Sequence, residues 1–397
     1  MKLAQRVSRV SPSPTLRITA EAKAMAARGV DVIDFASGEP DLDTPLTVKE
    51  AGIAAIRSGF TKYTAAGGTD ELKQAVLDKL RRDQGLRYEK SQVLISNGAK
   101  HSLYNLVQAF IEAGDEVIIP APYWVSYPDQ VLLNDGTPVL VPTEESAGFQ
   151  LTGALLERFV TPRTKAVIVN SPGNPTGAAY DRATLEGIAE AALRHGLLII
   201  SDEIYEKLLY DGLAHVSIAS LGPEVQARTV VVNGVSKAYS MTGWRIGYAA
   251  GPTDLIAAMT TVQSQSTSNP TSISQKAAVA ALNEGDVFVK EMIREFDQRR
   301  RYIVGRLNAI PGMRCAMPKG AFYAFPHVGR LIGRRASDGP LDSTTALADY
   351  LLTEARTALV PGEAFGAPEY LRLSYATGMP HIVTGLDRIE AAVHRLS

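Results

Sequence analysis

Short apolar runs alternate with longer stretches of helical periodicity through the middle of the chain. The runs are rich in Val, Ile and Leu and have the length of buried strands. They occupy residues 92–96, 116–120, 138–142, 165–170, 197–201, 229–233 and 246–250. Helical patterns such as 70–84 and 182–195 fill most of the gaps. Helices that separate short apolar strands are typical of a parallel sheet covered on both faces. We therefore expect an α/β fold whose large domain holds a mostly parallel seven-stranded sheet.

The two ends of the chain show a different pattern. Residues 15–28 have helical spacing and precede a short strand-like run. After a long helical pattern at 284–310, strand runs and helices mix without regular alternation. We expect a smaller α+β domain that the N-terminal arm completes. The predicted units are an arm with part of the small domain at 1–45, a large domain at 46–285 and a small domain at 286–397.

Composition narrows the functional classes. The 397 residues carry a formal net charge of −1, which gives no support to binding of nucleic acid or anionic membranes. No apolar run approaches the roughly 18 residues that cross a bilayer, and the N-terminus lacks the apolar core of a signal peptide. The single cysteine, Cys315, excludes an internal disulfide framework and argues against a zinc cluster, so we expect no metal and a cytoplasmic location. We interpret the basic run 299–301 as a solvated helix face.

One lysine follows the apolar run 229–233, within a segment of small and hydroxyl residues. A lysine in that place is either an ordinary surface charge or a nucleophile, whose amine burial and a nearby cation would keep partly neutral. Arg245 lies eight positions after Lys237 and could supply that cation or grip a phosphate. An amine that forms an imine beside a phosphate anchor points to pyridoxal 5′-phosphate (PLP).

Three polar residues follow other strands at the same expected edge of the sheet. Asp202 comes after the run 197–201, where its carboxylate could pair with a protonated pyridine nitrogen or simply cap a helix. Tyr205 could hydrogen-bond the phenolic oxygen of that ring. Asn174, in a loop dense in Pro and Gly, could reach the same oxygen or be a plain turn residue.

Further candidates each have a plainer reading. Gly98 and Ala99 lie where a strand passes into a helix, a place that suits a phosphate, although a glycine before a helix is weak evidence. Trp124 could stack on a flat cofactor or pack in the core. Arg372 alternates with apolar residues in a strand and could offer a fork to a carboxylate or face solvent.

Taken together, these motifs resemble the fold-type I PLP-dependent aminotransferases, in particular the class Ib bacterial aspartate and aspartate–prephenate aminotransferases. The resemblance covers nearly the whole chain from about residue 8. Its most specific blocks are SKAYSMTGWRIGY at 236–248, NSPGNPTG at 170–177, PAPYWVSYP at 120–128 and LRLSYA at 371–376.

The resemblance implies a role for each matching residue. Lys237 would form the Schiff base with PLP, Asp202 would meet the pyridine nitrogen, Tyr205 and Asn174 would bond the ring oxygen, and Trp124 would stack on the ring. The phosphate would be held by Gly98, Ala99, Ser236, Arg245 and, across a homodimer with shared active sites, Tyr63. The substrate would contact Arg372 through its α-carboxylate, and would also meet Gly38, Trp124, Asn174 and Phe322. Lys100 would hold the distal carboxylate, and Thr15 would accompany it in members that also use prephenate.

The expected activity is a ping-pong transamination of aspartate with 2-oxoglutarate, with prephenate as a further acceptor that the sequence leaves open. Lys237 would act as general base and acid at the substrate. Another PLP enzyme of the same fold, such as an aromatic or broad-specificity aminotransferase or a C–S lyase, is the alternative, because it would share the lysine, aspartate and arginine. A regulator with an aminotransferase-like domain is disfavoured, since no DNA-binding segment precedes residue 8.

Overall fold

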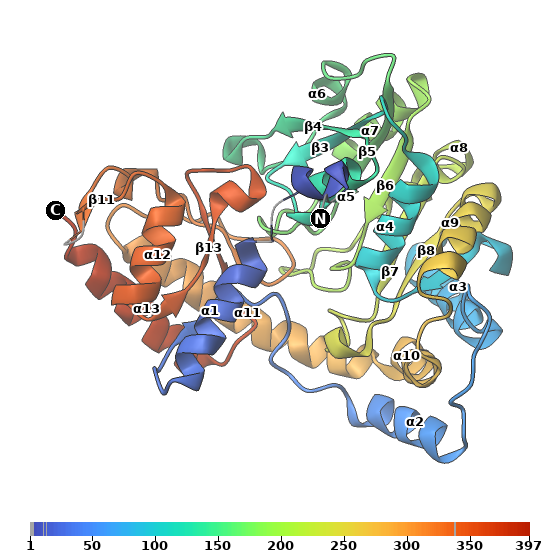
Figure 1. Ribbon diagram of the computed structural model, residues 1–397, viewed down its shortest axis with the longest axis horizontal. Coiled ribbons are helices and arrows are strands. Elements are labelled where there is room, and N and C mark those ends of the chain that lie inside the picture. The colour runs from blue at the N-terminus through green and yellow to red at the C-terminus, as the bar shows by residue number, and fades with distance from the viewer. Residues whose placement is uncertain (1–3, 11, 13, 337–338) are drawn as a thin grey trace.

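A computed structural model describes residues 4–10, 12, 14–336 and 339–397. Residues 1–3, 11 and 13 of the predicted N-terminal arm lie outside this range. The chain folds around two cores, one built on a large sheet and the other on smaller sheets and helices (Figure 1). The domain boundaries after residues 45 and 285 stay a prediction.

The large sheet has seven strands in the order β2-β8-β7-β6-β5-β3-β4. Only β8 runs antiparallel to its neighbours, so the predicted α/β class with a mostly parallel sheet is confirmed. The strands are β2 (Val93–Ser96), β3 (Glu116–Ala121), β4 (Thr137–Pro142), β5 (Thr164–Asn170), β6 (Leu198–Asp202), β7 (Thr229–Gly234) and β8 (Gly247–Ala250). The parallel strands end at one common edge, and β8 begins there.

Helices cover both faces of this sheet because its strands are apolar on both sides. In β7, Val230 and Val232 join the cluster under α4 and α9, whereas Val231 joins the cluster on the other face. Burial of each such side chain stabilises the fold by about 1.5–3 kcal/mol. One face carries α4 (Ala99–Phe110), α5 (Ser126–Leu133) and α9 (Thr253–Ser266). The other carries α3 (Asp70–Gln84), α6 (Gly153–Glu157), α7 (Arg182–Arg194), α8 (Pro223–Gln226) and α10 (Ser272–Glu284), with α2 (Leu46–Arg57) packed on α10.

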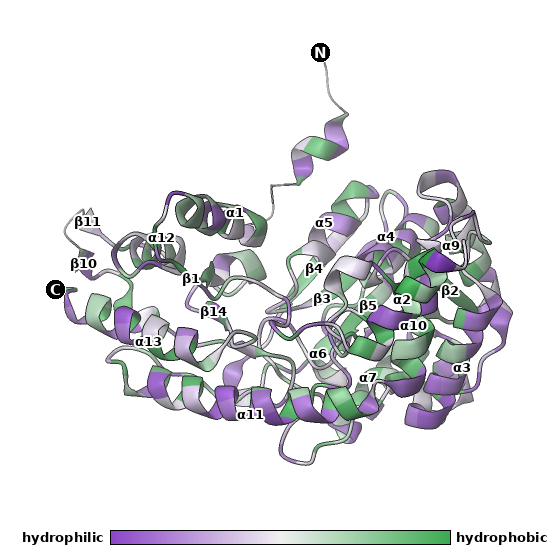
Figure 2. Cartoon of the chain, turned by 90° about the horizontal axis from the view of Figure 1, so that it is seen from below, coloured by the Kyte–Doolittle hydropathy of each residue, from purple (hydrophilic) through white to green (hydrophobic). Residues whose placement is uncertain are grey.

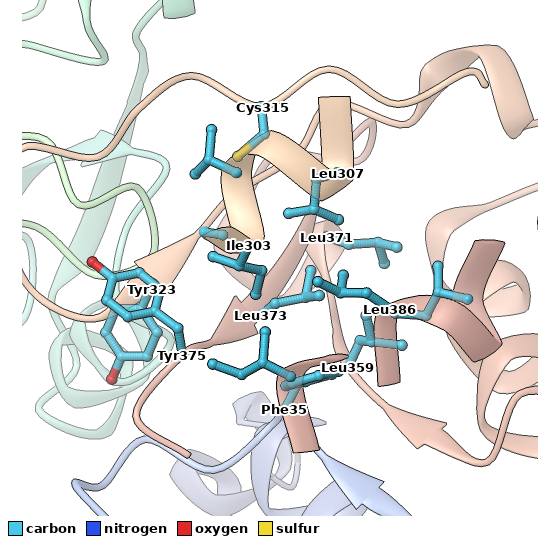
Figure 3. Packing of buried hydrophobic residues seen from close by; sticks show 14 of the residues in the cluster. Phe35, Ile303, Leu307, Cys315, Tyr323, Leu359, Leu371, Leu373, Tyr375 and Leu386 are labelled. Carbon is cyan, nitrogen blue, oxygen red and sulfur yellow. The ribbon is translucent and has the colours of Figure 1, made fainter. Parts of the chain in front are cut away.

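The second core joins both ends of the chain. Phe35 near the N-terminus packs in one cluster with Leu307, Leu371 and Leu386 (Figure 3). Its helices are α1 (Pro14–Ala27), α11 (Asp286–Ala309), α12 (Thr344–Glu354) and α13 (Met379–His394). Its strands are β1 (Ile33–Asp34) with β12 (Thr357–Ala358), β9 (Tyr323–Ala324) with β14 (Leu371–Ser374) and β13 (Val360–Pro361), and the hairpin β10 (Arg335–Ala336) and β11 (Gly339–Pro340).

The long helix α11 runs along both parts and alternates hydrophilic with hydrophobic residues (Figure 2). Our interpretation of its basic run as a solvated face was wrong. Arg300 is fully buried, where it bonds the Pro318 carbonyl and pairs with Asp211 at 2.9 Å. Arg299 is 4% exposed and pairs with Asp41. Only Arg301 keeps a largely exposed side chain. The other two guanidinium groups can be buried because acids distant in sequence, Asp41 and Asp211, pair with them.

Within the described ranges, no helix combines the length and the apolar character needed to cross a membrane.

Candidate active site

A cavity of about 330 Å³ opens where the parallel strands of the large sheet end. This edge is where α/β sheets place their ligands. Twelve of the predicted site residues line it: Thr15, Gly38, Ala99, Lys100, Trp124, Asn174, Asp202, Tyr205, Ser236, Lys237, Arg245 and Arg372. Thr15, Gly38 and Arg372 come from the part of the chain that forms the second core, so both cores contribute to the walls of the cavity.

Lys237 lies in the loop that follows β7, with its amine in the cavity. Its Nζ donates to the Gly38 carbonyl oxygen at 2.6 Å. Burial lowers the pKa of this amine from 10.5 to about 8, against an opposing effect of Glu39 and with help from the charges of Arg372 and Arg245. An amine with such a pKa is neutral in a useful fraction of molecules near neutral pH, as a nucleophile or base requires.

Asp202 is the last residue of β6 and is 3% exposed. Its Oδ2 accepts a hydrogen bond from the Tyr127 hydroxyl at 2.6 Å, and its Oδ1 accepts from the Ile204 N–H at 3.2 Å. Burial raises the pKa of the carboxyl to about 6, although the bond from Tyr127 opposes the shift. The group therefore titrates close to neutral pH.

Arg372 occupies β14, where our alternative of a surface arginine does not hold, since it is 2% exposed. Its Nη1 donates to the Asn174 side-chain oxygen at 3.0 Å and its Nη2 donates to the Ala36 carbonyl at 2.7 Å. The guanidinium carbon of Arg372 also lies 4.5 Å from the centre of the Tyr323 ring. Among the described residues, Nε has no hydrogen-bond partner. A buried cation with a spare donor in a cavity is suited to bind an anion.

Tyr205 is buried, and its hydroxyl lies 2.8 Å from the hydroxyl of Tyr323. We predicted that Phe322 lies near the substrate, but Tyr323 is the residue that lines the cavity. The Phe322 ring is fully buried and packs edge-on against Tyr205 at 5.4 Å. The two rings lie 4.8 Å apart and both contact the ring of Tyr205, so the sequence alone did not tell which of them would line the cavity.

The start of α4 and Arg245, two residues before β8, form one end of the cavity. Gly98 has a φ of +87°, and a Cβ on it would lie 2.4 Å from the Arg245 guanidinium, so only glycine fits there. Arg245 is held by the carbonyls of Thr242 and Asn97 at 2.9 and 3.1 Å. Gly98 itself does not line the cavity, but it brings Arg245 next to the first backbone N–H groups of α4.

Trp124 and Lys100, the second residue of α4, also line the cavity. The Lys100 amine lies 4.8 Å from the centre of the Trp124 ring, within the range of a cation–π contact. The Thr15 hydroxyl oxygen is buried without a partner in the described part of the chain. Lys100 therefore adds a second cation to the lining that contains Arg372.

Tyr63 stands apart from this cavity, whereas Gly98 and Phe322, which do not line it either, lie next to the lining residues Arg245 and Tyr205. The Tyr63 side chain is 91% exposed, in the loop between α2 and α3. Nothing in a single chain brings it to Arg245.

Sequence reasoning gave no role to Tyr127, Asn170 or Tyr323, which also line the cavity. Asn170 bonds the Asp202 carbonyl through its amide and accepts from the Asn174 N–H, so it shapes the loop that carries Asn174. The signal for Tyr127 lay in its position three residues after Trp124, which places both on one side of a helix start.

Comparison with known proteins agrees with this geometry. Residues 30–386 match the family model described as aminotransferase class I and II. The chain is 52% identical to an aspartate aminotransferase of Geobacillus stearothermophilus, with 98% of each protein covered. It is 48% identical to an aspartate/prephenate aminotransferase of Nitrosomonas europaea, over 98% of this chain and 99% of the relative.

Solved structures give the same result for the fold. The aspartate aminotransferase of Rhizobium meliloti superposes with a TM-score of 0.96 at 48% identity, over the whole of both chains. That of Thermus thermophilus with maleate gives a TM-score of 0.93 at 40% identity, over 99% of this chain and all of the other. With a lysine, an aspartate and an arginine around one cavity and relatives of this similarity over its full length, the chain belongs to the class I and II aminotransferase family.

Proposed function

We propose that the protein is a PLP-dependent aminotransferase that exchanges the amino group between aspartate and 2-oxoglutarate. The observation that carries the proposal is the placement of the Lys237 amine between Asp202 and Arg372 at one cavity. The printed names of its relatives support the substrate, because several are aspartate aminotransferases at 47–52% identity.

The residues present fit PLP. Gly98 offers no side-chain cap to α4, so the first N–H groups of the helix remain available for a phosphate, with Ser236 and Arg245 beside them. Trp124 could lie against one face of the ring. Asp202 could hold the pyridine nitrogen, and Tyr205 and Asn174 could bond the phenolic oxygen. Bound there, PLP would supply an aldehyde for the amine to condense with and a ring that withdraws electrons from the substrate's α-carbon.

The chain's own residues would handle the proton. The Lys237 amine, with a pKa of about 8, can take the proton from the substrate's α-carbon and release it later in the cycle. The Gly38 carbonyl, which accepts from the same amine, fixes the direction in which the proton is delivered. An ionised Asp202 would keep the ring nitrogen protonated.

Two cations at separate places suit a dicarboxylate. Arg372 would bind the α-carboxylate, and Lys100 would bind the distal one. A solved structure of the Thermus thermophilus relative carries maleate, a four-carbon dicarboxylate like aspartate. Thr15, whose buried hydroxyl faces the same cavity, supports prephenate as a second acceptor, as does the name of the Nitrosomonas europaea relative.

We further propose a homodimer with shared active sites. The outer surface of α2 and the loop after it exposes Leu46, Ile56 and Tyr63, at 67%, 56% and 91%. Large apolar side chains gathered in this way are typical of an interface. A partner chain seated here would carry its Tyr63 toward the phosphate end of the cavity. The buried free thiol of Cys315 suits a reducing compartment, so a cytoplasmic location is part of the proposal.

Steady-state transamination by the purified protein tests the proposal. We expect turnover of aspartate with 2-oxoglutarate, with the rate depending on both substrates in a ping-pong pattern. Prephenate offered in place of 2-oxoglutarate tests the second acceptor. If PLP binds but no dicarboxylate pair reacts, the substrate assignment is wrong and the cofactor assignment stands.

A further inference from the structure

Tyr127 makes the shortest contact with the carboxylate at the centre of the site. Its hydroxyl donates to Asp202 Oδ2 at 2.6 Å, and both side chains are 3% exposed. The residue is the second of α5, on the sheet face covered by α4, and its ring meets Trp124 edge-on at 5.3 Å. Tyr127 thus contacts both Trp124 and Asp202, to which the proposed function assigns a ring face and the ring nitrogen of PLP.

The Asp202 carboxylate has few other donors. Its Oδ1 accepts only the Ile204 N–H, at 3.2 Å, and in the described part of the chain Tyr127 is its single side-chain donor. A buried carboxylate loses its hydration, and it stays ionised only where hydrogen bonds or cations replace the lost water. Loss of this one hydroxyl would therefore leave half of the carboxylate without compensation.

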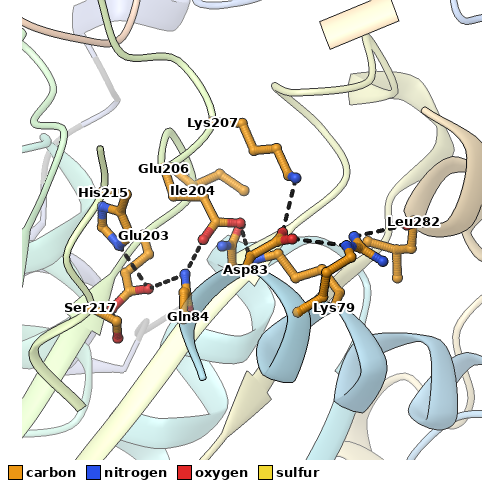
Figure 4. Close-up of polar contacts among 12 residues, drawn as sticks. Lys79, Asp83, Gln84, Glu203, Ile204, Glu206, Lys207, His215, Ser217 and Leu282 are labelled. Atoms are coloured by element: carbon orange, nitrogen blue, oxygen red, sulfur yellow. Dashed lines mark hydrogen bonds and ion pairs between the residues drawn. The ribbon is translucent and has the colours of Figure 1, made fainter. Parts of the chain in front are cut away.

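The charged and titratable groups around Asp202 oppose one another. Glu203 follows it directly in the chain and favours the protonated form, whereas Lys237 across the cavity favours the ionised form. Tyr205 lies on the same loop and stays neutral, because burial raises its pKa. Glu203 itself is paired with His215 at 3.0 Å and bonded by Ser217 at 2.6 Å, so its charge is fixed (Figure 4).

We propose that Tyr127 is a positioning residue that keeps Asp202 ionised and aimed at the pyridine nitrogen of bound PLP. The inference rests on the proposed function, which assigns Asp202 to that nitrogen. A protonated carboxyl is a weaker acceptor for the N–H of a pyridinium than a carboxylate is, and it gives the ring no countercharge. Tyr127 would act through Asp202 and need not touch the substrate.

The test measures the binding of PLP to the Tyr127→Phe apoprotein by equilibrium dialysis at pH 6, 7.5 and 9. We expect binding about 10- to 100-fold weaker than in the wild type at pH 7.5, the range for a lost hydrogen bond to a charged group. The loss should shrink at pH 9, because Asp202 ionises again even without the tyrosine. A PLP analogue with C–H in place of the ring nitrogen should bind both proteins equally well.

Tyr210→Phe is the matched control, since its hydroxyl is equally buried but bonds the Ala321 carbonyl instead of Asp202. An equal loss for PLP and for the carbon analogue, independent of pH, would mean that Tyr127 acts by packing alone and would overturn the inference. Unchanged PLP binding at every pH would overturn it as well. If the wild type itself does not distinguish PLP from the analogue, the assignment of Asp202 in the proposed function fails instead.

Discussion

Lys237 is held in a protonation state that the fold disfavours. Below about pH 8 its amine is charged in the folded and the unfolded protein, and the folded protein bears the cost of enclosing the charge. Between pH 8 and 10.5 the folded protein releases the proton while the unfolded chain keeps it. The stability of the folded state therefore rises with pH across this window.

A Lys237→Met apoprotein removes that dependence. We expect the variant to gain its largest advantage in urea midpoint over the wild type below pH 8, and to lose the advantage as the pH rises toward 10.5. Urea unfolding followed by circular dichroism at pH 7.5, 9 and 10 measures the difference. Lys62→Met, which removes an exposed lysine, is the control and should show no such trend. A constant difference at all three values would contradict the enclosed-charge account.

Arg372 offers geometry as well as charge. Two of its nitrogens are committed to Asn174 and Ala36, so the guanidinium plane is fixed before any substrate binds. Lysine would keep the charge but lose the planar fork.

We predict that Arg372→Lys raises the KM for aspartate and for 2-oxoglutarate about 10- to 100-fold, the effect of losing one hydrogen bond to a charged group. The dissociation constant of PLP should change little, because the proposed function assigns Arg372 to the substrate and not to the cofactor. Steady-state kinetics and cofactor titration of the same preparation measure both quantities. Arg301→Lys, at an exposed position of α11, serves as the control. A larger effect on PLP than on KM would place Arg372 in the cofactor site.

Among the elements, those with a strong local signal were predictable. The seven strand runs were found because each is apolar on both faces, and α3, α7 and α13 because their periodicity is long. Partners distant in sequence were not predictable. The burial of Arg300 depends on Asp211, 89 residues away, and the placement of Tyr323 in the cavity wall involves Tyr205, 118 residues away. The site lysine, aspartate and arginine were found because each follows or occupies a strand; Tyr127 was not, because its role is visible only beside Asp202.

Lys79 of α3 pairs with Glu206 of the loop after β6, and a second buried ion pair lies within the segment that follows β6. His215 pairs with Glu203, and Gln84 of α3 bonds both Glu203 and Glu206 (Figure 4). The neighbouring carboxylate of Glu203 raises the pKa of His215 above 6.5 despite its burial. The pair therefore contributes its full stability below pH 6.5 and loses it as the pH rises through the raised pKa of the folded state.

We predict that His215→Asn destabilises the protein by about 3 kcal/mol at pH 6, since it leaves a buried carboxylate without its cation. The destabilisation should be smaller at pH 9, because the wild-type histidine loses its proton as the pH rises. Urea midpoints at the two values, at one protein concentration, give the comparison. His195→Asn, at an exposed position at the end of α7, is the control. Equal destabilisation at both values would show that His215 contributes by packing and not by charge.

For the molecule as a whole, the two cores meet at the cavity. Lys237 and Asp202 belong to the large sheet, whereas Arg372 and Gly38 belong to the second core, so substrate and cofactor groups are assembled only when the cores are in place. The single chain still leaves Tyr63 at the surface. If the proposed dimer is right, each complete site takes its tyrosine from the other chain.

A hybrid dimer separates the two arrangements. One chain carries Tyr63→Ala with Lys237 intact, and the other carries Lys237→Ala with Tyr63 intact. In a dimer with shared sites, the first chain's lysine meets the second chain's tyrosine, so one site is complete and the other has both lesions. We expect each pure variant to be impaired and the hybrid, purified with two affinity tags after joint refolding or coexpression, to show about half of wild-type turnover and to bind PLP normally at one site. If Tyr63 served its own chain's site, the hybrid would contain no complete site, and its turnover would stay at the average of the two variants.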